Sequence, residues 1–512
     1  MDDMNVEPET PNTSKRVTLK RRHAKVLRKV AEAGLGDAGV KPRQHARPAA
    51  LRRGGGFGAL RRKPSRHRTK SFNPARTMVL GFLVIIFAGA CLLKLPIASR
   101  DGGSVPFLTA LFTSTSATCV TGLIVVDTAT TWSFFGRAVI LCLFQIGGLG
   151  FITITTIFFF LMDRKISLTQ RLLMVQSLNL HDRQGIVGQV RSVLLGTFIF
   201  EGFGALILWA RFAPDYGVWG GLGMGVFHSV SAFCNAGFAL MGDFRRFSSL
   251  AAYSGDVVVM ITIMLLVFIG GLGFFVWEDV RRRRRFSRLH LHSKLVLTIS
   301  LSLIVVGWVF FYFTERSNPA TLGGMPFSQA AVASLFQSVM PRSGGFSVFD
   351  QAAQKGVSKL VSMALMFVGG SAGSTAGGIK NVTAGILVLS ALRSMMGKRR
   401  LTVFKRTIPE TQVVSAFSIV CMALSAWFIG TVAVALIQPE LPVIGVMFEM
   451  ASAIATCGLS HGIVPLLAPV PMVIAMLLIF FGRIGIMTVG MAAFFKHGQV
   501  ETTKRPETWV MM

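Results

Sequence analysis

Four times along this chain, two long apolar runs enclose a shorter apolar segment that ends in a glycine-containing turn. The paired long runs cover residues 78–95 and 134–162, 193–209 and 257–277, 295–313 and 360–392, and 413–437 and 470–495. An apolar helix of roughly 20 residues can cross the hydrocarbon core of a bilayer, so these runs predict eight transmembrane helices. Charged residues make up only 15% of the 512 residues, against about 25% in soluble proteins, which also indicates a membrane protein.

The enclosed segments are shorter than a membrane span. They cover residues 107–117, 221–233, 327–340 and 443–455. Such a re-entrant helix, followed by an irregular turn, is acceptable at membrane depth only where protein or a water-filled path surrounds it. The pattern therefore predicts an all-α membrane protein with four membrane–pore–membrane repeats, that is, eight transmembrane helices and four re-entrant pore helices around one pseudo-fourfold pore. The expected repeats cover residues 77–165, 189–285, 292–394 and 411–497.

The four turns align with one another. They read Val120-Thr121-Gly122-Leu123, Asn235-Ala236-Gly237-Phe238, Ser343-Gly344-Gly345-Phe346 and Thr456-Cys457-Gly458-Leu459. Their glycines are 115, 108 and 113 residues apart, and the sequence IGGLGF occurs both at 146–151 and at 269–274. A repeat of this length is too long for a solenoid and suits four units around one axis.

A pore has a chemical use for glycine in these turns. Inward-pointing backbone carbonyls can replace the water shell of a monovalent cation, and glycine supplies the unusual dihedrals and close packing that such a backbone needs. The carboxyl ends of the short helices add partial negative charge, and no carboxylate ring typical of a divalent-cation site occurs in the turns. The alternative explanation of the four glycines is that each caps the carboxyl end of its own short helix and that the four turns are unrelated. The predicted filter residues are Cys119, Val120, Thr121, Gly122, Cys234, Asn235, Ala236, Gly237, Arg342, Ser343, Gly344, Gly345, Ala455, Thr456, Cys457 and Gly458.

Four acidic residues flank the turns: Asp127, Asp243, Asp350 and Glu449. They could concentrate cations near the pore mouth, or they could be ordinary solvated or helix-capping residues. The six cysteines form no C-x-x-C pair and the nine histidines show no metal-ligand spacing, which speaks against a disulfide framework and a zinc site.

The basic residues indicate the orientation. With the amino terminus inside, the presumed inner segments hold 40 of the 53 Lys and Arg residues, as the positive-inside rule expects. Both termini, including the tail 498–512, are then cytoplasmic and the turns open outward. Residues 1–76 carry 20 basic and 6 acidic residues and are expected to be disordered, as a tail on anionic lipid or as a regulatory arm. This distribution does not favour nucleic-acid binding.

Two features inside the apolar runs suggest a gate. The first is the glycine-rich stretch 369–378, which disfavours a continuous helix and predicts either an unwound segment lining a path or close helix packing through small residues. The second is Arg483, an intramembrane charge and by default a functional hypothesis. It would act as an electrostatic barrier or hold helix-end carbonyls. The residues of these two features are Gly369, Gly370, Ser371, Gly373, Ser374, Thr375, Gly377, Gly378 and Arg483; Lys380, just after the stretch, contributes to the barrier or lies at the inner interface.

These motifs resemble the Trk/Ktr/HKT superfamily of potassium transporters, most closely its Ktr-type membrane subunit, KtrB. The resemblance covers residues 77–512 and rests on TSATCVTGLIVVDT, QIGGLGF, HSVSAFCNAGF, QSVMPRSGGF, GSTAGGIK, ATCGLSHG, FGRIGIMT and the ending Lys504-Arg505-Pro506-Glu507. It implies potassium uptake across the plasma (inner) membrane, passive or sodium-dependent, with K⁺ bound at the filter and Na⁺ as a coupling or activating ion. It also maps the family's gating loop onto 369–378 and its gate arginine onto Arg483.

The resemblance further implies a homodimer and a cytosolic RCK-type ring of regulatory subunits (KtrA-like) that binds ATP/ADP or NAD(H). This chain has no G-x-G-x-x-G unit of its own. Sodium-selective relatives replace the first filter glycine by serine, so Gly122 favours potassium. The sequence departs from the family at Ala372 and Ala376, where Pro and Gly are common, and at Gly344, where Ala is common.

Two other functions compete with a potassium pore. A broken-helix secondary transporter for Na⁺, or for K⁺ coupled to H⁺, would have two inverted halves with a midplane site, whereas the turns repeat in four units of one orientation. An intramembrane enzyme would use Ser371 or Ser374 as nucleophile, and the sequence places no histidine in a span near that loop to activate it. We therefore expect a transporter rather than an enzyme.

Overall fold

The structure is a computed structural model that describes residues 74–150, 186–397 and 400–485. These residues belong to one compact unit, Thr69–Met512. Four of the described helices are long and apolar enough to cross a membrane, or five if one bent pair of helices is a single span. The predicted arm 1–76, apart from its last three residues, and the predicted tail 498–512 lie outside the described residues.

The helices follow the predicted order of long span, short helix and second span. Each long span begins a repeat: α2 (Pro74–Lys94), the first part of α8 (Ile186–Phe233), α11 (Leu291–Glu315) and α15 (Glu410–Ile437). The short helices are α3 (Phe107–Thr118), the end of α8, α12 (Phe327–Val339) and α16 (Val443–Ala455). The second spans are α5 (Phe134–Leu149), α9 (Val257–Leu272) with α10 (Phe274–Arg283), α13 (Gly356–Phe367) with α14 (Asn381–Met395), and α17 (Pro469–Ile484).

Proline and glycine separate the long spans from the short helices. In three repeats a proline comes directly before the short helix, namely Pro106, Pro326 or Pro442. Proline has no backbone N–H and cannot continue a helix from the preceding segment. In the second repeat the separation lies within α8, where Gly217 has φ 73° and follows Pro214. The short helices match the predicted segments, except that the second is continuous with its span across this kink.

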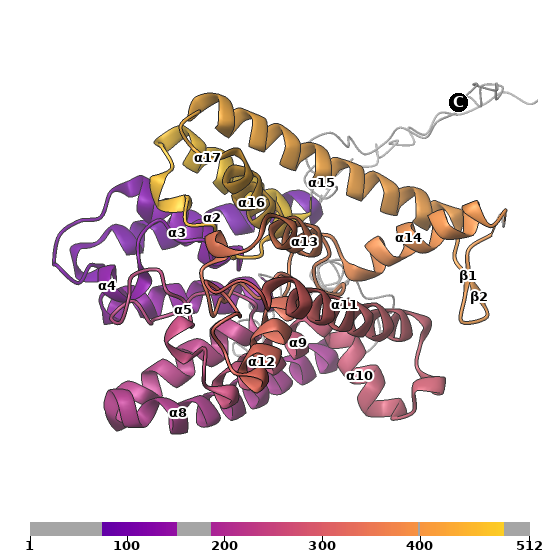
Figure 1. The fold of residues 1–512 in the computed structure, drawn as a ribbon, viewed down its shortest axis with the longest axis horizontal. Helices are drawn as coiled ribbons and strands as arrows, with labels where there is room; N and C mark the ends of the chain where they lie inside the picture. Colours follow the sequence, from indigo (N-terminus) through magenta and orange to yellow (C-terminus); the bar gives the residue numbers. More distant parts are fainter. Residues whose placement is uncertain (1–73, 151–185, 398–399, 486–512) are drawn as a thin grey trace, which may run out of the picture. The chain divides into compact units, whose positions relative to one another are not determined.

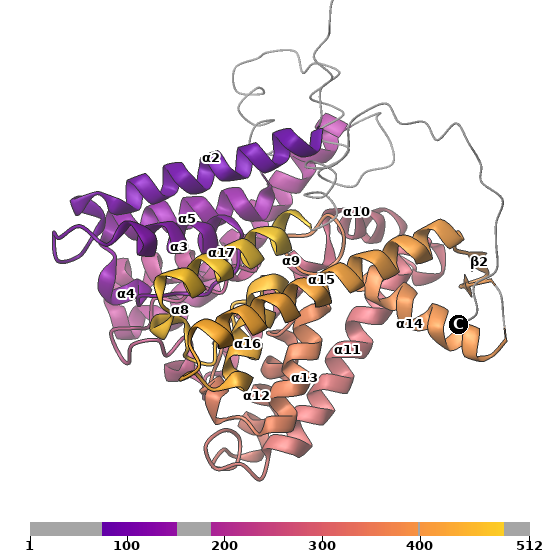
Figure 2. The ribbon, with the colours of Figure 1, turned by 90° about the horizontal axis from the view of Figure 1, so that it is seen from above.

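The repeats pack against one another in a closed cycle. Helix α5 contacts α8, α9 contacts α12, α13 contacts α16, and α17 returns to contact α3 of the first repeat. Figures 1 and 2 show the colours running around the centre, from the indigo helices α2, α3 and α5 to the yellow α16 and α17. Each short helix lies toward the middle of this arrangement and is largely buried.

The described helix of each second span ends or breaks at an equivalent place, which the sequence predicted only for the third; the remainders of the predicted runs 134–162 and 470–495 lie outside the described residues. Helices α5, α9 and α17 end at Gly150, Gly273 and Gly485, which have φ of 83°, 90° and 89°. This left-handed region is readily adopted only by glycine. At Gly273 the chain turns by 93° between α9 and α10, so the predicted run 257–277 is not one straight helix. In the third repeat, residues 368–380 separate α13 from α14.

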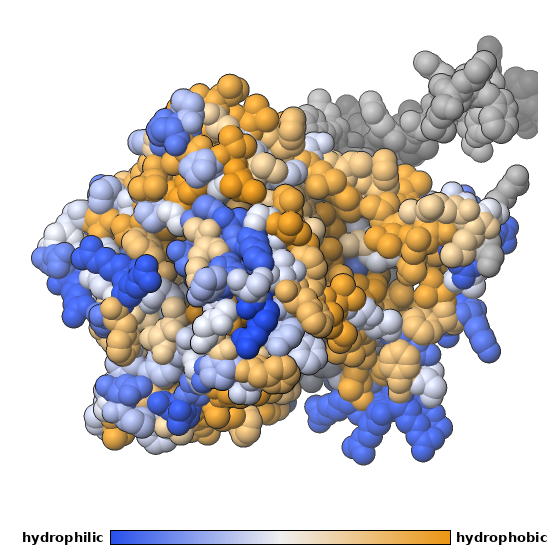
Figure 3. All heavy atoms as spheres, in the orientation of Figure 1, coloured by the Kyte–Doolittle hydropathy of each residue, from blue (hydrophilic) through white to orange (hydrophobic). Residues whose placement is uncertain are grey.

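Apolar and basic residues are segregated on the surface. Long spans such as α15 expose large hydrophobic side chains, including Phe417, Phe428 and Leu436, as expected for helices that face lipid. Figure 3 shows these orange surfaces, and hydrophilic residues gathered beyond the end of α10. The arginine run 281–285 lies there. The short hairpin of β1 (Thr402–Val403) and β2 (Arg406–Thr407) connects α14 to α15.

Candidate functional site

The structure brings the four predicted turns together at the centre of the helices. A methyl group on Gly237 would lie 2.8 Å from the Cα of Gly345, and one on Gly345 would lie 3.4 Å from the Cα of Gly458. A methyl group on Gly458 would clash with the carbonyl oxygen of Thr121. A methyl group on Gly122 would lie 3.1 Å from the Cα of Gly237. The four glycine positions therefore form a ring in chain order, and none has room for a side chain.

The backbone has the same conformation in every turn. The residue two positions before the glycine has positive φ in all four, although none of the four is glycine: Val120 (55°), Asn235 (59°), Ser343 (65°) and Thr456 (46°). A left-handed valine is an outlier that costs about 1–3 kcal/mol and persists only where the surroundings enforce it. Four matching outliers indicate one shared backbone geometry rather than four unrelated helix ends.

In three of the four repeats, a serine near the carboxyl end of the short helix forms a hydrogen bond to the glycine-containing turn. The backbone N–H of Gly122 donates to Ser116 Oγ over 3.1 Å, and that of Gly458 donates to Ser452 Oγ over 3.0 Å. In the second turn Ser231 Oγ donates to the carbonyl oxygen of Phe238 over 2.8 Å. Each serine lies six residues before the glycine. The third repeat has Val339 at that position, so its turn is held differently.

Serines also dock the short helices against the long spans. The hydroxyls of Ser114, Ser229 and Ser338 donate to carbonyl oxygens of Ile86, Glu201 and Ile304, over 2.6 to 2.7 Å. Opposite each serine, the long span carries a glycine whose added methyl group would meet the serine oxygen: Gly89, Gly204 or Gly307. The close approach of helix to helix at these glycines fixes the depth of the short helices.

Side chains of the turns contact the surrounding helices or the segment before a neighbouring turn. Cys234 Sγ lies 3.2 Å from Gln145 Oε1 in α5, and Cys457 Sγ lies 3.1 Å from the carbonyl oxygen of Pro341. The Arg342 guanidinium donates to the carbonyl oxygen and hydroxyl of Ser300 in α11, over 3.1 and 3.0 Å. These side chains support the turns from outside the ring.

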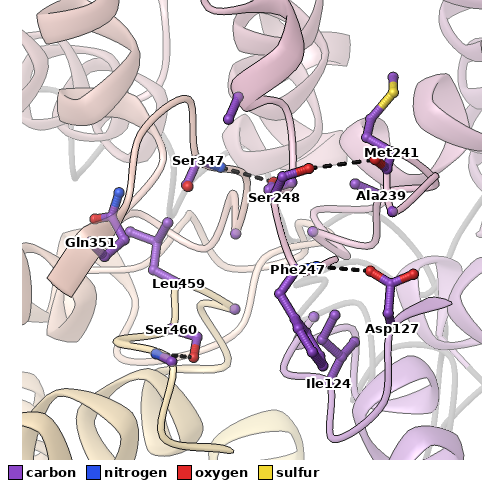
Figure 4. A pocket seen from close by; sticks show the side chains of 18 of the residues that line it. Ile124, Asp127, Ala239, Met241, Phe247, Ser248, Ser347, Gln351, Leu459 and Ser460 are labelled. Carbon is purple, nitrogen blue, oxygen red and sulfur yellow. Dashed lines mark hydrogen bonds between the residues drawn. The ribbon is translucent and has the colours of Figure 1, made fainter. Parts of the chain in front are cut away.

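A cavity of about 260 Å³ opens on one side of the ring. All four turn glycines line it, together with residues of the segments that leave the turns. Figure 4 shows Asp127, Phe247, Ser347 and Ser460, one residue from each repeat, around this space. The loop of the second repeat is tied to its neighbours, because the N–H of Phe247 donates to Asp127 Oδ2 and that of Leu250 donates to the Ser347 carbonyl oxygen, both over 2.9 Å.

The acidic residues near the turns mainly have structural partners. Asp127 caps α4 (Thr128–Thr131), and Asp350 caps η4 (Gln351–Ala353), which confirms the capping alternative for both. Asp243 pairs with Arg100 over 3.2 Å, with both side chains about half exposed. Glu449 has none of the predicted roles, which were to concentrate cations at the mouth, to be solvated or to cap a helix, because its side chain is completely buried in the middle of the short helix α16.

The glycine-rich segment 368–380 packs beneath the turns on the side away from the cavity. Its N–H groups at Ser371 and Thr375 donate to the carbonyl oxygens of Gly271 and Gly270, over 2.9 and 3.2 Å, and Phe274 donates back to Gly373 over 3.0 Å. Thr375 Oγ1 donates to the carbonyl oxygen of Phe233 over 3.0 Å. The predicted unwinding is thus confirmed, and the loop occupies the break between α9 and α10.

The same loop also touches the fourth turn. A methyl group on Gly378 would lie 3.0 Å from the carbonyl oxygen of Ala455, and one on Gly377 would clash with Thr456 Oγ1. Ala376 is fully buried, and a methyl group on Gly370 would lie 2.6 Å from its Cβ. The alanine at 376 therefore fills space inside the loop.

Two cations bind carbonyl groups of this region. Arg483 near the end of α17 donates to the carbonyl oxygens of Thr375 in the loop and Gly147 in α5. Lys380 Nζ donates to the carbonyl oxygen of Ala376 over 2.9 Å. Within the described residues neither cation pairs with a carboxylate. Arg483 thus links two helices and the loop, which is the carbonyl-holding arrangement that the sequence left open.

A histidine lies near the loop, contrary to the sequence expectation. His292 Nε2 in α11 is 3.4 Å from Ser371 Oγ. Ser371 also donates to the carbonyl oxygen of Ala372 over 3.3 Å and is completely buried. A long contact at a serine without solvent access does not support a nucleophile.

All six cysteines are free, and in the described part of the chain no group of three His, Cys, Asp or Glu side chains could hold a metal ion.

Sequence reasoning missed the polar residues behind the turns. In the second repeat, Gln145 Nε2 donates to both carboxylate oxygens of Glu201, over 3.0 and 3.1 Å, deep between α5 and α8. His228 and Gln337 lie within the short helices and are also buried. Their position within apolar helices could have revealed them. A polar side chain there is costly to bury unless it is hydrogen-bonded, so it indicates a specific partner.

Comparison with known proteins places the chain in a family. Residues 58–504 match TrkH, described as a cation transport protein. The chain is 36% identical to the potassium/sodium uptake protein NtpJ of Enterococcus hirae, over 86% of this chain and 98% of that protein. It is 37% identical to Ktr system potassium uptake protein B of Bacillus subtilis, over 81% and 92% of the two chains.

The fold is also that of a solved transporter. The crystal structure of the potassium transporter TrkH from Vibrio parahaemolyticus matches with a TM-score of 0.67, at 16% identity, over 84% of this chain and 86% of that chain. The family and the apolar helices make this a membrane protein. The match along nearly the whole chain, and the identity to Ktr proteins, show that the chain belongs to the Trk/Ktr superfamily of cation transport proteins and is similar to KtrB.

Proposed function

We propose that this protein takes up potassium ions across the plasma membrane as the ion-translocating subunit of a Ktr-type system. The observation that carries the proposal is the ring of four turns, in which glycines with positive φ meet without room for side chains. The uptake functions in the names of the two relatives support potassium as the ion.

Potassium would be selected by backbone carbonyls of the four turns, at residues 119–122, 234–237, 342–345 and 455–458. Because the turn side chains contact the surrounding helices or are buried beside them, the groups left for an ion are largely main-chain oxygens. Such oxygens can substitute for the hydration shell of K⁺. The positive φ at the glycine and two residues before it recurs in all four turns, so equivalent peptide groups have the same orientation in each repeat.

The loop 368–380, with Lys380 and Arg483, would form the gate. It packs against the second and fourth repeats, and Lys380 and Arg483 donate hydrogen bonds to its carbonyl oxygens. A positive charge on the ion path repels cations electrostatically. Moving the loop requires breaking the bonds from Arg483 to Thr375 and Gly147, so a regulatory subunit could set the flux by stabilising one position of the loop.

The remaining parts of the proposal concern assembly and orientation. We propose a homodimer, a cytosolic ring of RCK-type, KtrA-like subunits binding ATP/ADP or NAD(H), and anionic lipid at the basic arm 1–76. The basic residues place both termini in the cytoplasm and the cavity outside. Sodium would serve as coupling or activating ion, in keeping with the name of one relative.

The alternative is a broken-helix secondary transporter for another cation, Na⁺ or K⁺ coupled to H⁺. The broken helices at Gly273 and at 368–380 resemble those of such proteins. Here, however, the glycine turns repeat in four units rather than in two inverted halves.

Complementation tests the proposal. A bacterial strain lacking its own potassium uptake systems is given this chain with its regulatory subunit and grown at low external potassium. We expect growth and uptake of a radioactive potassium analogue, with an empty vector as control. Expression in the membrane without growth or uptake would contradict potassium uptake, and uptake of sodium alone would favour the alternative.

A further inference from the structure

One position in the short helices is chemically different in each repeat. It directly follows a buried phenylalanine: Phe112, Phe227, Phe336 or Phe448. The residues at this position are Thr113, His228, Gln337 and Glu449, and each is at most 2% exposed. Burying four polar side chains in the interior of a membrane protein has a free-energy cost, so their partners indicate what they do.

Glu449 binds the segment that leaves the fourth turn. Its Oε1 accepts hydrogen bonds from Ser460 Oγ over 2.6 Å and from the backbone N–H groups of His461 and Ile463, over 2.8 and 3.3 Å. These donors follow Gly458 by two to five residues. Three hydrogen bonds to one carboxyl oxygen fix the course of the chain directly after the turn.

His228 and Gln337 do the same by different chemistry. The His228 ring donates from Nδ1 to the carbonyl oxygen of Met224 over 2.8 Å, and its Nε2 accepts from the N–H of Leu240 over 3.2 Å. Gln337 exchanges two amide hydrogen bonds with Gln351, over 3.0 and 3.2 Å. Leu240 follows Gly237 by three residues, and Gln351 follows Gly345 by six.

Thr113 differs from the other three. Its hydroxyl donates to the carbonyl oxygen of Thr109 over 2.9 Å, which lies one turn back in the same helix. No hydrogen bond from its side chain reaches the segment after Gly122 within the described residues. That segment is held instead by Asp127, whose Oδ2 accepts from Phe247 of the second repeat.

We propose that His228, Gln337 and Glu449 are positioning residues for ion selection, each clamping its turn by hydrogen bonds to the segment that leaves it, and that Thr113 is not. This inference rests on the proposed function, because it assumes that the turns select the ion. The clamps set the spacing of the turns from behind without touching the ion. Removing one loosens a single turn and weakens the preference for potassium over sodium.

The test compares equivalent positions in proteoliposomes that contain the chain with its regulatory subunit. Uptake of potassium is measured with and without competing sodium for the wild type and for Glu449→Leu, His228→Leu and Thr113→Val. We expect Glu449→Leu to raise the potassium KM relative to that for sodium by about tenfold, which corresponds to about 1.4 kcal/mol. We expect His228→Leu to have a smaller effect in the same direction, and Thr113→Val to match the wild type.

Conservative variants separate positioning from general stability. Glu449→Gln and His228→Gln keep an acceptor oxygen for the same N–H groups, so we expect both to restore the wild-type preference. Ser460→Ala removes one donor from outside the helix, and we expect it to weaken the preference in a protein that still inserts. If Glu449→Leu does not fold, Ser460→Ala still tests the hydrogen bonds of Glu449.

The outcomes distinguish the two proposals. If the wild type does not transport potassium, the proposed function fails. If the wild type selects potassium and both Glu449→Leu and Ser460→Ala leave the preference unchanged, the positioning role is overturned. An effect of Thr113→Val as large as that of Glu449→Leu would overturn it as well.

Discussion

The four turns and the loop 368–380 are both irregular, glycine-rich backbone inside a membrane protein, but they are held in different ways. The turns occur four times with matching dihedrals, and they are fixed by close glycine contacts and by hydrogen bonds with side chains of the short helices. The loop occurs once, in the third repeat, and is fixed by backbone hydrogen bonds to the break in α9 and by two cations.

This difference indicates which region can move. A ring in which each glycine leaves no room for a methyl group cannot shift one turn without displacing its neighbours, as expected for close-packed interiors. The loop lies at the ends of interrupted helices, where a few residues can absorb changes of dihedral angle. We therefore propose that the ring of turns selects the ion and that the loop gates its passage, and the variants below test that division.

The largest effect is expected from adding one methyl group to the ring. In Gly237→Ala the new carbon would lie 2.8 Å from the Cα of Gly345, at a residue with φ 70°. Potassium uptake should fall by at least about tenfold, since both the backbone strain and the clash oppose the native turn.

Gly102→Ala is the matched control for this variant. Gly102 also has positive φ, 67°, but nothing lies within 4 Å of an added methyl group. Its uptake should stay close to the wild type. Equal losses in both variants would show that backbone strain alone is responsible and that the ring contact is unimportant.

A several-fold effect of opposite sign is expected at the loop. Arg483→Ala removes the donors to Thr375 and Gly147 and a positive charge, so potassium flux without the regulatory subunit should rise about three- to tenfold. Flux is measured as radiotracer uptake into proteoliposomes. Unchanged or lower flux would contradict the gating role.

Arg483→Lys then separates charge from geometry. Lysine keeps the charge but lacks the planar guanidinium that reaches two carbonyl groups at once. Low flux in this variant would assign the gating effect to the charge. Flux as high as in Arg483→Ala would assign it to the bridge between α5, α17 and the loop.

Much of the arrangement could be predicted from the sequence because it repeats. The four glycines, the short helices before them and the unwound segment after residue 368 were all visible as local patterns. Glycine and proline report backbone conformation directly, so the kinks at Gly217 and the loop follow from residue type. The resemblance to a family added the expectation that this segment and Arg483 form a gate.

The remaining features depend on contacts between distant residues. The 93° bend at Gly273 was missed because the run 257–277 is apolar throughout, and the bend is stabilised by Phe274 donating to Gly373, about a hundred residues later. Burial of Glu449 was missed, and the residue was expected to be solvated, to cap a helix or to lie near the mouth, because sequence position does not reveal which face of a short helix is buried. His292 was missed near Ser371 for the same reason.

The central claim is that the ring of turns selects potassium, and Gly122→Ser tests it most directly. The serine side chain would meet the carbonyl oxygen of Ala236 in the next turn and alter the spacing of the ring. Proteoliposomes with potassium on one side and sodium on the other give a reversal potential. We predict that the wild type sets it close to the potassium equilibrium potential and that Gly122→Ser moves it toward that of sodium; an unchanged, potassium-selective reversal potential in Gly122→Ser would contradict the claim.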